Sequence, residues 1–328
     1  MKKFSISMAC ALGLLSCFSL TAFAQELLLG GRIVGIEMST RGVLVAELSR
    51  VETAEGQSCP AKDAGIEPGD IILSVNGAPV EKGADIIAAV ENSAGEELHL
   101  GLERSGRAMQ LSLRPALSGE GQWMLGMWLR DGVSGIGTLT FQDPASGIYG
   151  ALGHAISDKG KAVELKEGSI CKAQIVAVEP GAAGDPGELK GCSELDEPLG
   201  SIEKNSPSGI FGKSFEALAM EKVETGKLST GPAYMLSTIN GSEARPYSVE
   251  INRVYRDQGR EQAVITVTDP ELLAKTGGIV QGMSGSPLLQ NGKLVAAVTH
   301  VFVADPSRGY ALGISDMLRA AGIEDRAA

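Results

Sequence analysis

The sequence predicts a mainly β fold in two domains, preceded by a targeting segment. Glycine is abundant, with 43 residues in a chain of 328, while aromatic residues make up only 4%. This mixture is typical of short strands joined by tight turns rather than of helical bundles, and a chain of this length favours two domains. The net charge of -11 argues against a nucleic-acid partner, because binding to phosphates requires a basic face.

The first 24 residues predict export. Lys2 and Lys3 precede an uncharged stretch, residues 4–24, that ends in Ala22-Phe23-Ala24. A basic start, an apolar centre and small residues at the end predict a signal peptide cleaved before Gln25. The same stretch is long enough to span a bilayer as an uncleaved anchor, and Leu14-Leu15-Ser16-Cys17 offers a lipoprotein site as a third alternative. Each alternative exports the rest of the chain.

The cysteines and histidines argue against a metal site, and we expect no cofactor. Beyond the targeting segment, Cys59, Cys171 and Cys192 lie at no spacing typical of metal ligands. They allow at most one disulfide, for which Cys171 and Cys192 are the favoured pair, and free buried thiols are the alternative. The chain has three histidines and no H-E-x-x-H motif, so a metallopeptidase is disfavoured.

Residues 25–115 predict a peptide-binding domain. Its run A-G-I-E-P-G-D-I-I-L-S-V-N-G, residues 64–77, places a strand between two tight turns, and a helix is expected at 83–91. This part of the chain resembles a PDZ domain. The resemblance implies that an extended peptide adds a strand between residues 43–46 and the helix, with its carboxylate held by the turn Thr40-Arg41-Gly42-Val43.

Residues 116–328 contain a candidate general base. Residues 135–141 and 148–154 read as a hairpin that delivers His154 at the end of a strand, between Gly153 and Ala155. Small neighbours leave an imidazole uncovered, which a general base requires. A structural histidine is the alternative interpretation of His154 alone.

A candidate nucleophile lies farther along the same domain. The run G-M-S-G-S-P, Gly282 to Pro287, matches the trypsin-like pattern G-x-S-G-x-P, in which Ser284 holds the nucleophile position and Ser286 has the weaker claim. Glycine on either side lets the backbone turn sharply, so that the N–H groups of Gly282 and Ser284 can face a developing oxyanion. His154 precedes Ser284 by 130 residues, the order found in chymotrypsin-like enzymes. We therefore expect a trypsin-like double β-barrel peptidase domain after the PDZ-like domain.

Several longer motifs together resemble the stage IV sporulation protein B peptidase family. They are G-I-G-T-L-T-F, G-A-L-G-H-A-I-S-D, G-I-F-G, V-T-D-P-E-L-L, T-G-G-I-V-Q-G-M-S-G-S-P and V-T-H-V-F-V-A-D-P-S-R-G-Y. The resemblance implies a serine endopeptidase of endospore-forming bacteria, secreted into the space between the forespore and mother-cell membranes. There it would cleave a membrane-anchored regulator, which triggers processing of a sigma-factor precursor, and it would also cleave itself. The PDZ groove would take a peptide ligand or the chain's own end.

Carried over by position, the resemblance implies His154 as the base, Ser284 as the nucleophile and Asp269 of V-T-D-P as the acid. Asp158, four residues after His154, is the rival acid, and an Asp before Pro is also a common turn former. His300 is expected to line the cleft or to pack structurally. The alternative function is a catalytically silent PDZ scaffold of the cell envelope.

Overall fold

The fold was examined in a computed structural model that describes residues 25–158, 161–216 and 221–323. The expected targeting segment, residues 1–24, lies outside the described residues. Within the described residues, no helix combines the length and apolar character needed to cross a membrane. The mainly β prediction is confirmed, because strands far outnumber helices along the chain.

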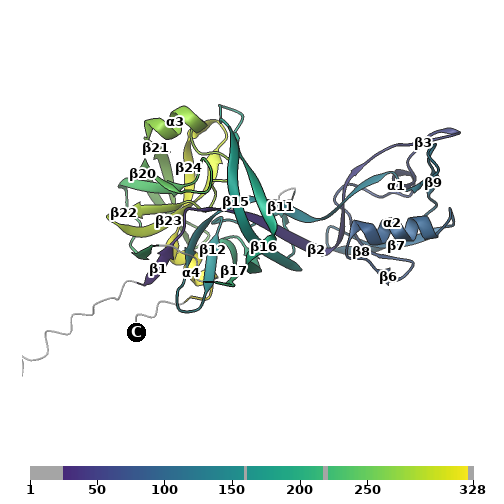
Figure 1. The fold of residues 1–328 in the computed structure, drawn as a ribbon, viewed down its shortest axis with the longest axis horizontal. Helices are drawn as coiled ribbons and strands as arrows, with labels where there is room; N and C mark the ends of the chain where they lie inside the picture. The colour runs from purple at the N-terminus through teal and green to yellow at the C-terminus, as the bar shows by residue number, and fades with distance from the viewer. Residues whose placement is uncertain (1–24, 159–160, 217–220, 324–328) are drawn as a thin grey trace, which may run out of the picture.

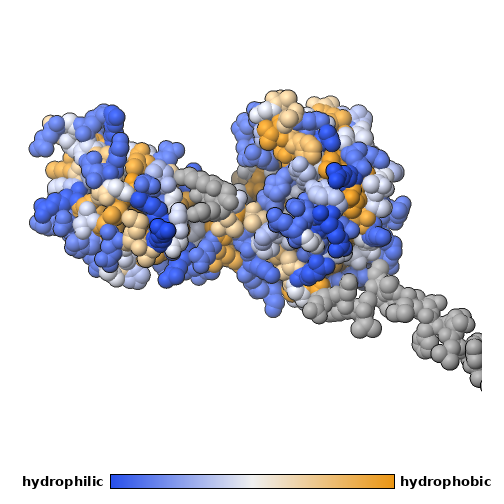
Figure 2. Space-filling model, turned by 180° about the vertical axis from the view of Figure 1, so that it is seen from behind, coloured by the Kyte–Doolittle hydropathy of each residue, from blue (hydrophilic) through white to orange (hydrophobic). Residues whose placement is uncertain are grey.

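Two lobes of unequal size are joined by two long strands, β2 (Ile33–Leu48) and β11 (Met127–Gln142) (Figure 1). The two strands are antiparallel neighbours, and their pairing continues from the large lobe into the small one, with Thr138 opposite Ile33 and Met127 opposite Leu48. The space-filling view from behind shows the same two bodies separated by a waist (Figure 2). The chain therefore passes between the two lobes along the paired strands β2 and β11.

The small lobe is a sheet with one long helix packed on it. Its core is apolar and includes Val43 and Val45 of β2 together with Ile86 and Val90 of the helix. The remaining elements of this lobe are β3 (Val51–Thr53), β4 (Gly56–Ser58), α1 (Pro60–Asp63), β5 (Ile71–Val75), β6 (Ala78–Pro79), α2 (Gly83–Asn92), β7 (Leu98–Arg104), β8 (Arg107–Leu113), β9 (Ala116–Leu117) and β10 (Trp123–Met124).

The tight turn before β5 is held by a buried ion pair. Asp70 is only 1% exposed, and both of its carboxylate oxygens accept hydrogen bonds of 2.7 Å from the guanidinium of Arg104 on β7. A bidentate pair of this kind fixes geometry as well as charge. The same carboxylate accepts the backbone N–H of Glu67. The last residue of the Pro68-Gly69-Asp70 turn thus bonds the turn to β7.

The first part of the large lobe is built on the sheet that passes through both lobes. Among the described residues its strands run in the order β18, β1, β11, β12, β17, β16, β15, β2 before the sheet continues into the small lobe. The elements not yet given are β1 (Glu26–Leu29), β12 (Ile148–Ala151), β13 (Ser157–Asp158), β14 (Lys161–Ala162), β15 (Glu167–Glu179), β16 (Glu188–Ser206), β17 (Gly209–Ser214) and β18 (Lys222–Glu224).

The second part of the large lobe is a closed six-stranded barrel. Its strands follow the order β19-β20-β21-β24-β23-β22. The inward side chains alternate with outward ones, as in β21, where Ala263, Ile265 and Val267 are buried and face the barrel core. The elements are β19 (Gly231–Ser237), β20 (Arg245–Asp257), β21 (Arg260–Val267), α3 (Pro270–Thr276), β22 (Pro287–Gln290), β23 (Lys293–Phe302), β24 (Asp305–Gly313) and α4 (Ile314–Ala320).

Two segments pair with strands on the other side of the expected boundary between residues 115 and 116. Strand β1 pairs with β11 and β18, and Leu27 is buried in a cluster with Phe141 and Leu294 of the large lobe. The N-terminal residues therefore extend the large lobe. Conversely, the first residues of β11 pair with the second half of β2 in the small lobe. Each lobe therefore contains a strand segment from the part of the sequence that forms most of the other lobe.

The cysteines of the large lobe are free. Cys171 is buried and Cys192 is exposed, and both lie in the β15–β16 ladder opposite other residues, Pro198 and Gln174 respectively. The favoured disulfide is therefore not formed, and the alternative of free thiols holds. Burial, followed by the charge of Glu37, raises the pKa of the Cys171 thiol.

Candidate active site

One cavity of the large lobe brings the predicted base and nucleophile together. The cavity has a volume of about 540 Å³ and is lined by His154, Ser284, Thr299 and His300, with apolar side chains such as Ile136 around them. His154 lies in the loop after β12, Ser284 in the loop before β22, and His300 on β23. A volume of several hundred Å³ is typical of ligand sites. The two segments, far apart in the sequence, thus contribute to the same cavity.

The loop that carries Ser284 is fixed by two buried threonines of β11. Thr138 donates its backbone N–H to the Ser284 carbonyl at 2.9 Å and its hydroxyl to the Gly282 carbonyl at 3.0 Å. Thr140 donates its hydroxyl to the Gly285 carbonyl at 2.7 Å. Because all three carbonyls are turned toward β11, the loop is held in one orientation. The sequence gives no sign of this role, because both threonines look like ordinary strand residues in G-I-G-T-L-T-F.

The amide groups of the same loop are left available. Within the described ranges, the N–H groups of Gly282 and Ser284 donate to no protein acceptor. Gly285 must be glycine, because its φ is +95° and a Cβ there would lie 2.0 Å from the carbonyl oxygen of Thr138. Two free amides beside a serine hydroxyl form an arrangement of the kind that stabilises an oxyanion.

The loop that presents His154 has an unusual backbone. Leu152 and Gly153 adopt successive positive φ values of +68° and +69°. A positive φ at a leucine is strained and persists only where the surroundings enforce it. After the histidine, the loop is anchored by Asn205 of β16, whose amide bonds both the N–H and the carbonyl of Ile156 at 2.9 Å. The backbone is therefore constrained both before and after His154.

A backbone carbonyl determines the tautomer of His154. Its Nδ1 lies 2.8 Å from the carbonyl oxygen of Ala155. A carbonyl only accepts hydrogen bonds, so Nδ1 carries the proton and Nε2 keeps its lone pair. Burial lowers the pKa of His154, and the bond to Ala155 opposes this shift in part. The imidazole is therefore neutral at neutral pH, with Nε2 free to accept a proton.

The second imidazole of the cavity stacks on the first. The ring centroids of His154 and His300 are 4.5 Å apart, at an interplanar angle of 35°. His300 retains exposed surface, yet desolvation within the cavity, and then the charge that His154 can carry, lower the pKa of His300 to about 4. His300 is therefore neutral at pH 7. It lines the cavity, as expected, and it adds no competing positive charge there.

The two serines of the loop have different surroundings. The hydroxyl of Ser284 donates to the carbonyl of Thr299 at 2.7 Å and faces the cavity. Ser286 is fully buried and bonds the hydroxyl of Ser237 at 3.0 Å. Only Ser284 is placed where a substrate can reach it. Rotation about its Cα–Cβ bond is needed before its proton can pass to His154.

Asp269, the acid implied by the family resemblance, is not brought to the imidazole. It is the N-cap of α3, where its Oδ1 accepts the N–H groups of Glu271 and Leu272 at 3.0 Å. Its Oδ2 accepts the N–H of Ser248 at 3.2 Å. The residues that line the cavity do not include Asp269. The physical reason is local, because Asp followed by Pro is a strong helix start.

The rival acid cannot be placed in the same way. The backbone of Asp158 pairs with Lys161 in the short β13–β14 ladder. Its side chain lies outside the described part of the structure. Among the described residues, the hydrogen-bond partner found at Nδ1 of His154 is therefore the Ala155 carbonyl rather than a carboxylate.

These contacts predict a small effect on turnover when Asp269 is replaced by Asn, because Asn caps helices as well as Asp does. We expect peptide hydrolysis by Asp269→Asn to stay within a few-fold of the wild type. Asp269→Ala should lower the free energy of unfolding by about 0.5–2 kcal/mol through loss of the cap. Kinetics and thermal unfolding of both variants check this. A loss of about four orders of magnitude in Asp269→Asn, as for an orienting carboxylate, would instead restore the acid role.

The predicted peptide-binding turn of the small lobe lies inside a strand. Thr40-Arg41-Gly42-Val43 belongs to β2, where Gly42 adopts a φ of +86° and the Thr40 hydroxyl donates to the Gly42 carbonyl at 3.1 Å. The register of β2 against β11 shifts at this point, because Leu44 faces Arg130 whereas Ser39 faces Gly132. The four residues therefore form a bulge rather than a free loop between two strands.

Metal binding has no candidate in the described part of the chain. No group of three or more His, Cys, Asp or Glu side chains there is arranged to hold an ion.

Curated relatives share part of this sequence. The zinc metalloprotease RasP of Shouchella clausii is 36% identical over 63 residues, covering 19% of this chain and 15% of the relative. A putative zinc metalloprotease of Brucella suis biovar 1 is 27% identical over 195 residues, covering 58% of this chain and 48% of the relative. The chain thus spans less than half of the length of these relatives.

Solved structures resemble each lobe only distantly. The PDZ domain of the SdrC-like protein from Listeria monocytogenes has a TM-score of 0.23 and 18% identity, covering 28% of this chain and 92% of that domain. The active form of the Rv3671c protease from M. tuberculosis has a TM-score of 0.38 and 14% identity, covering 58% of this chain and 75% of the protease.

Family membership is clear from the sequence families that match. The PDZ domain family matches residues 53–104, in the small lobe. The SpoIVB peptidase S55 family matches residues 121–318, which include His154, Ser284 and most of the other residues that line the cavity. The chain therefore belongs to the SpoIVB peptidase S55 family of serine peptidases and carries a PDZ domain.

Proposed function

We propose that this chain is an exported serine endopeptidase in which Ser284 is the nucleophile and His154 the general base. One observation carries the proposal: the Ser284 hydroxyl, the free Nε2 side of His154 and two unpaired amides belong to one cavity. These are the parts that acyl transfer needs, namely a nucleophile, a base and an oxyanion site.

The reaction uses these groups in order. The Ser284 oxygen attacks the carbonyl carbon of the scissile peptide bond as its proton passes to Nε2 of His154. As the carbonyl oxygen becomes negatively charged, it accepts hydrogen bonds from the N–H groups of Gly282 and Ser284. The imidazolium then protonates the leaving amine, and water, activated by the same imidazole, hydrolyses the acyl-enzyme. The Ala155 carbonyl keeps the imidazole in the required tautomer, and neutral His300 does not repel the transient charge.

The cellular role follows from the family resemblance. We propose that the enzyme acts in the space between the forespore and mother-cell membranes, cleaves a membrane-anchored regulator so that a sigma-factor precursor is processed, and cleaves itself. The test is complementation in an endospore-forming host that lacks its own S55 peptidase. The wild-type chain should restore processing of the sigma-factor precursor, and the Ser284→Ala chain should not. Restoration by both chains would contradict a proteolytic role.

The low pKa of His154 predicts the pH dependence of hydrolysis. The base is active when neutral, so activity is lost as the pH falls through the pKa of His154. Burial places that pKa below its ordinary value of 6.5. We therefore expect kcat/KM to rise with pH to a plateau, with its half-maximum below pH 6.5. A pH profile with one peptide substrate measures this, and a half-maximum above pH 7 would contradict the neutral imidazole.

A further inference from the structure

The peptide-binding edge of the PDZ domain is already occupied. PDZ ligands add an extended strand to a sheet edge that faces a helix. Here that edge is the second half of β2, and the neighbouring helix is α2. Strand β11 pairs antiparallel with this edge, placing Leu129 opposite Val45 and Arg130 opposite Leu44. We infer that the segment Met127–Asp131 is a built-in ligand of the PDZ domain, and that an outside peptide binds only by displacing it.

Side chains of the segment alternate as those of a bound strand do. Met127 and Leu129 are partly buried against the core cluster that contains Val45 of β2 and Ile86 of α2. Between them, Trp128 is 65% exposed. A Cβ placed on Gly83, the first residue of α2, would lie 3.5 Å from the Cβ of Leu129. Leu129 therefore lies between β2 and α2, where a PDZ domain binds a side chain of its ligand.

The segment also ends on a carboxylate at the expected end of the groove. Because β11 is antiparallel to β2, it runs toward the bulge of Thr40-Arg41-Gly42-Val43, which faces Asp131. The Asp131 side chain accepts the backbone N–H of Gly83 at the start of α2. A carboxylate thus lies near the place where the terminal carboxylate of a PDZ ligand would bind. The groove fits an extended peptide with an apolar side chain two residues before a carboxylate.

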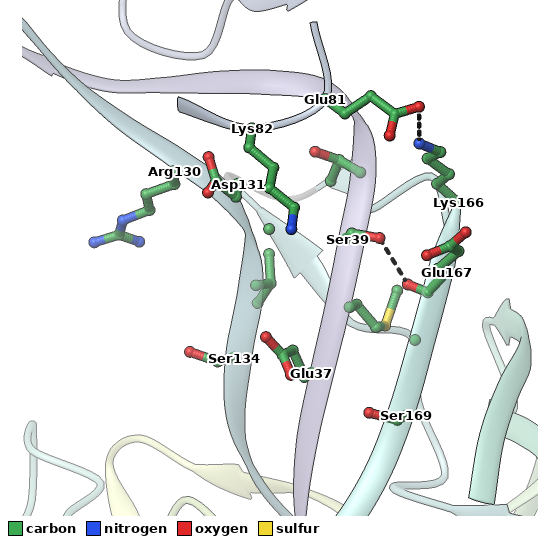
Figure 3. Close-up of a pocket in the computed structure, with 15 residues that line it drawn as sticks. Glu37, Ser39, Glu81, Lys82, Arg130, Asp131, Ser134, Lys166, Glu167 and Ser169 are labelled. Carbon is green, nitrogen blue, oxygen red and sulfur yellow. Dashed lines mark hydrogen bonds and ion pairs between the residues drawn. The ribbon is translucent and has the colours of Figure 1, made fainter. Parts of the chain in front are cut away.

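Further contacts join the two lobes next to the segment. Lys166 forms an ion pair of 2.6 Å with Glu81, and the Ser39 hydroxyl donates to the Glu167 carbonyl at 3.3 Å (Figure 3). In the same view Asp131 and Lys82 are labelled close to each other. A tethered strand competes at an effective concentration on the order of millimolar. An identical peptide added in solution therefore competes poorly with it.

The test uses a fluorescent synthetic peptide of residues 126–132, with its C-terminus amidated, in fluorescence anisotropy. All proteins carry Ser284→Ala so that the probe cannot be cleaved, and the result is independent of the proposed activity. We expect weak binding by this parent protein. Leu129→Asp loses the apolar contact of the tethered strand, frees the groove and should bind the probe at least tenfold more tightly. Trp128→Asp, on the exposed side of the same strand, is the matched control and should bind as the parent does.

Equal affinity in the parent and Leu129→Asp proteins would overturn the inference, as would equal strengthening by Trp128→Asp. A second measurement on the parent guards against misfolding of Leu129→Asp. Saturation with several millimolar unlabelled peptide should increase hydrogen exchange of the backbone amides at 127–131, because the tethered strand leaves the sheet. Unchanged exchange at saturation would show that the peptide binds elsewhere and would also overturn the inference.

Discussion

Ser284→Ala should abolish peptide hydrolysis, with a rate loss on the order of a millionfold, because it removes the hydroxyl that attacks the scissile carbonyl in the proposed mechanism. The fold should survive, since the hydroxyl makes a single hydrogen bond, to the Thr299 carbonyl. Hydrolysis of a peptide substrate and thermal unfolding of the purified variant measure the two effects separately.

Ser286→Ala is the matched control for this prediction. Ser286 is fully buried and bonds Ser237 away from the cavity. We expect Ser286→Ala to retain hydrolysis and to lose about 0.5–1.5 kcal/mol of the free energy of unfolding, the usual value of one hydrogen bond. An active Ser284→Ala variant together with an inactive Ser286→Ala variant would reverse the assignment.

His154→Ala should be as damaging as Ser284→Ala, and the double variant no slower than either single variant. The two residues act as a unit, because the hydroxyl attacks only when the imidazole can take its proton. Steady-state rates of the three variants with one peptide measure the effect. Rate losses that multiply in the double variant would mean that His154 and Ser284 act independently, and would exclude the proton transfer described here.

His154 and Ser284 could be picked out from the sequence as candidate catalytic residues because the signals around them are local. Glycines around Ser284 are demanded by backbone geometry, and at Gly285 a side chain would collide with the Thr138 carbonyl. The small neighbours of His154 likewise reflect a crowded loop with positive φ values. Residue patterns of this kind are visible in a sequence because each depends on a few adjacent positions.

The role expected of Asp269 came from the family resemblance, whereas the local sequence pointed elsewhere. Asp269-Pro270 followed by Glu271 is a helix start, with an N-cap residue, Pro at the first helical position and an acidic first turn. The structure follows this local signal. The partner of His154 that was missed is the Ala155 carbonyl, which no side-chain motif could reveal.

The pairing of β11 with the PDZ edge was not predictable from local patterns either. Alternation at Met127, Trp128 and Leu129 predicts a strand, but it does not say which edge the strand will join. The same holds for β1 and the start of β11, which each pair with strands distant in sequence. The pairing of strands that lie far apart in the sequence depends on how the whole core packs.

The central claim, a reactive Ser284 activated by His154, is tested most directly by labelling with a fluorophosphonate probe. The chain from Gln25 onward is incubated with the probe, and the modified residue is located by peptide mapping in the wild type, His154→Ala and Ser286→Ala. We predict a single adduct on Ser284 in the wild type and Ser286→Ala, and labelling slowed by several orders of magnitude in His154→Ala. An unlabelled wild type would contradict the account and favour a catalytically silent PDZ scaffold, and an adduct on another residue would contradict the assignment of Ser284.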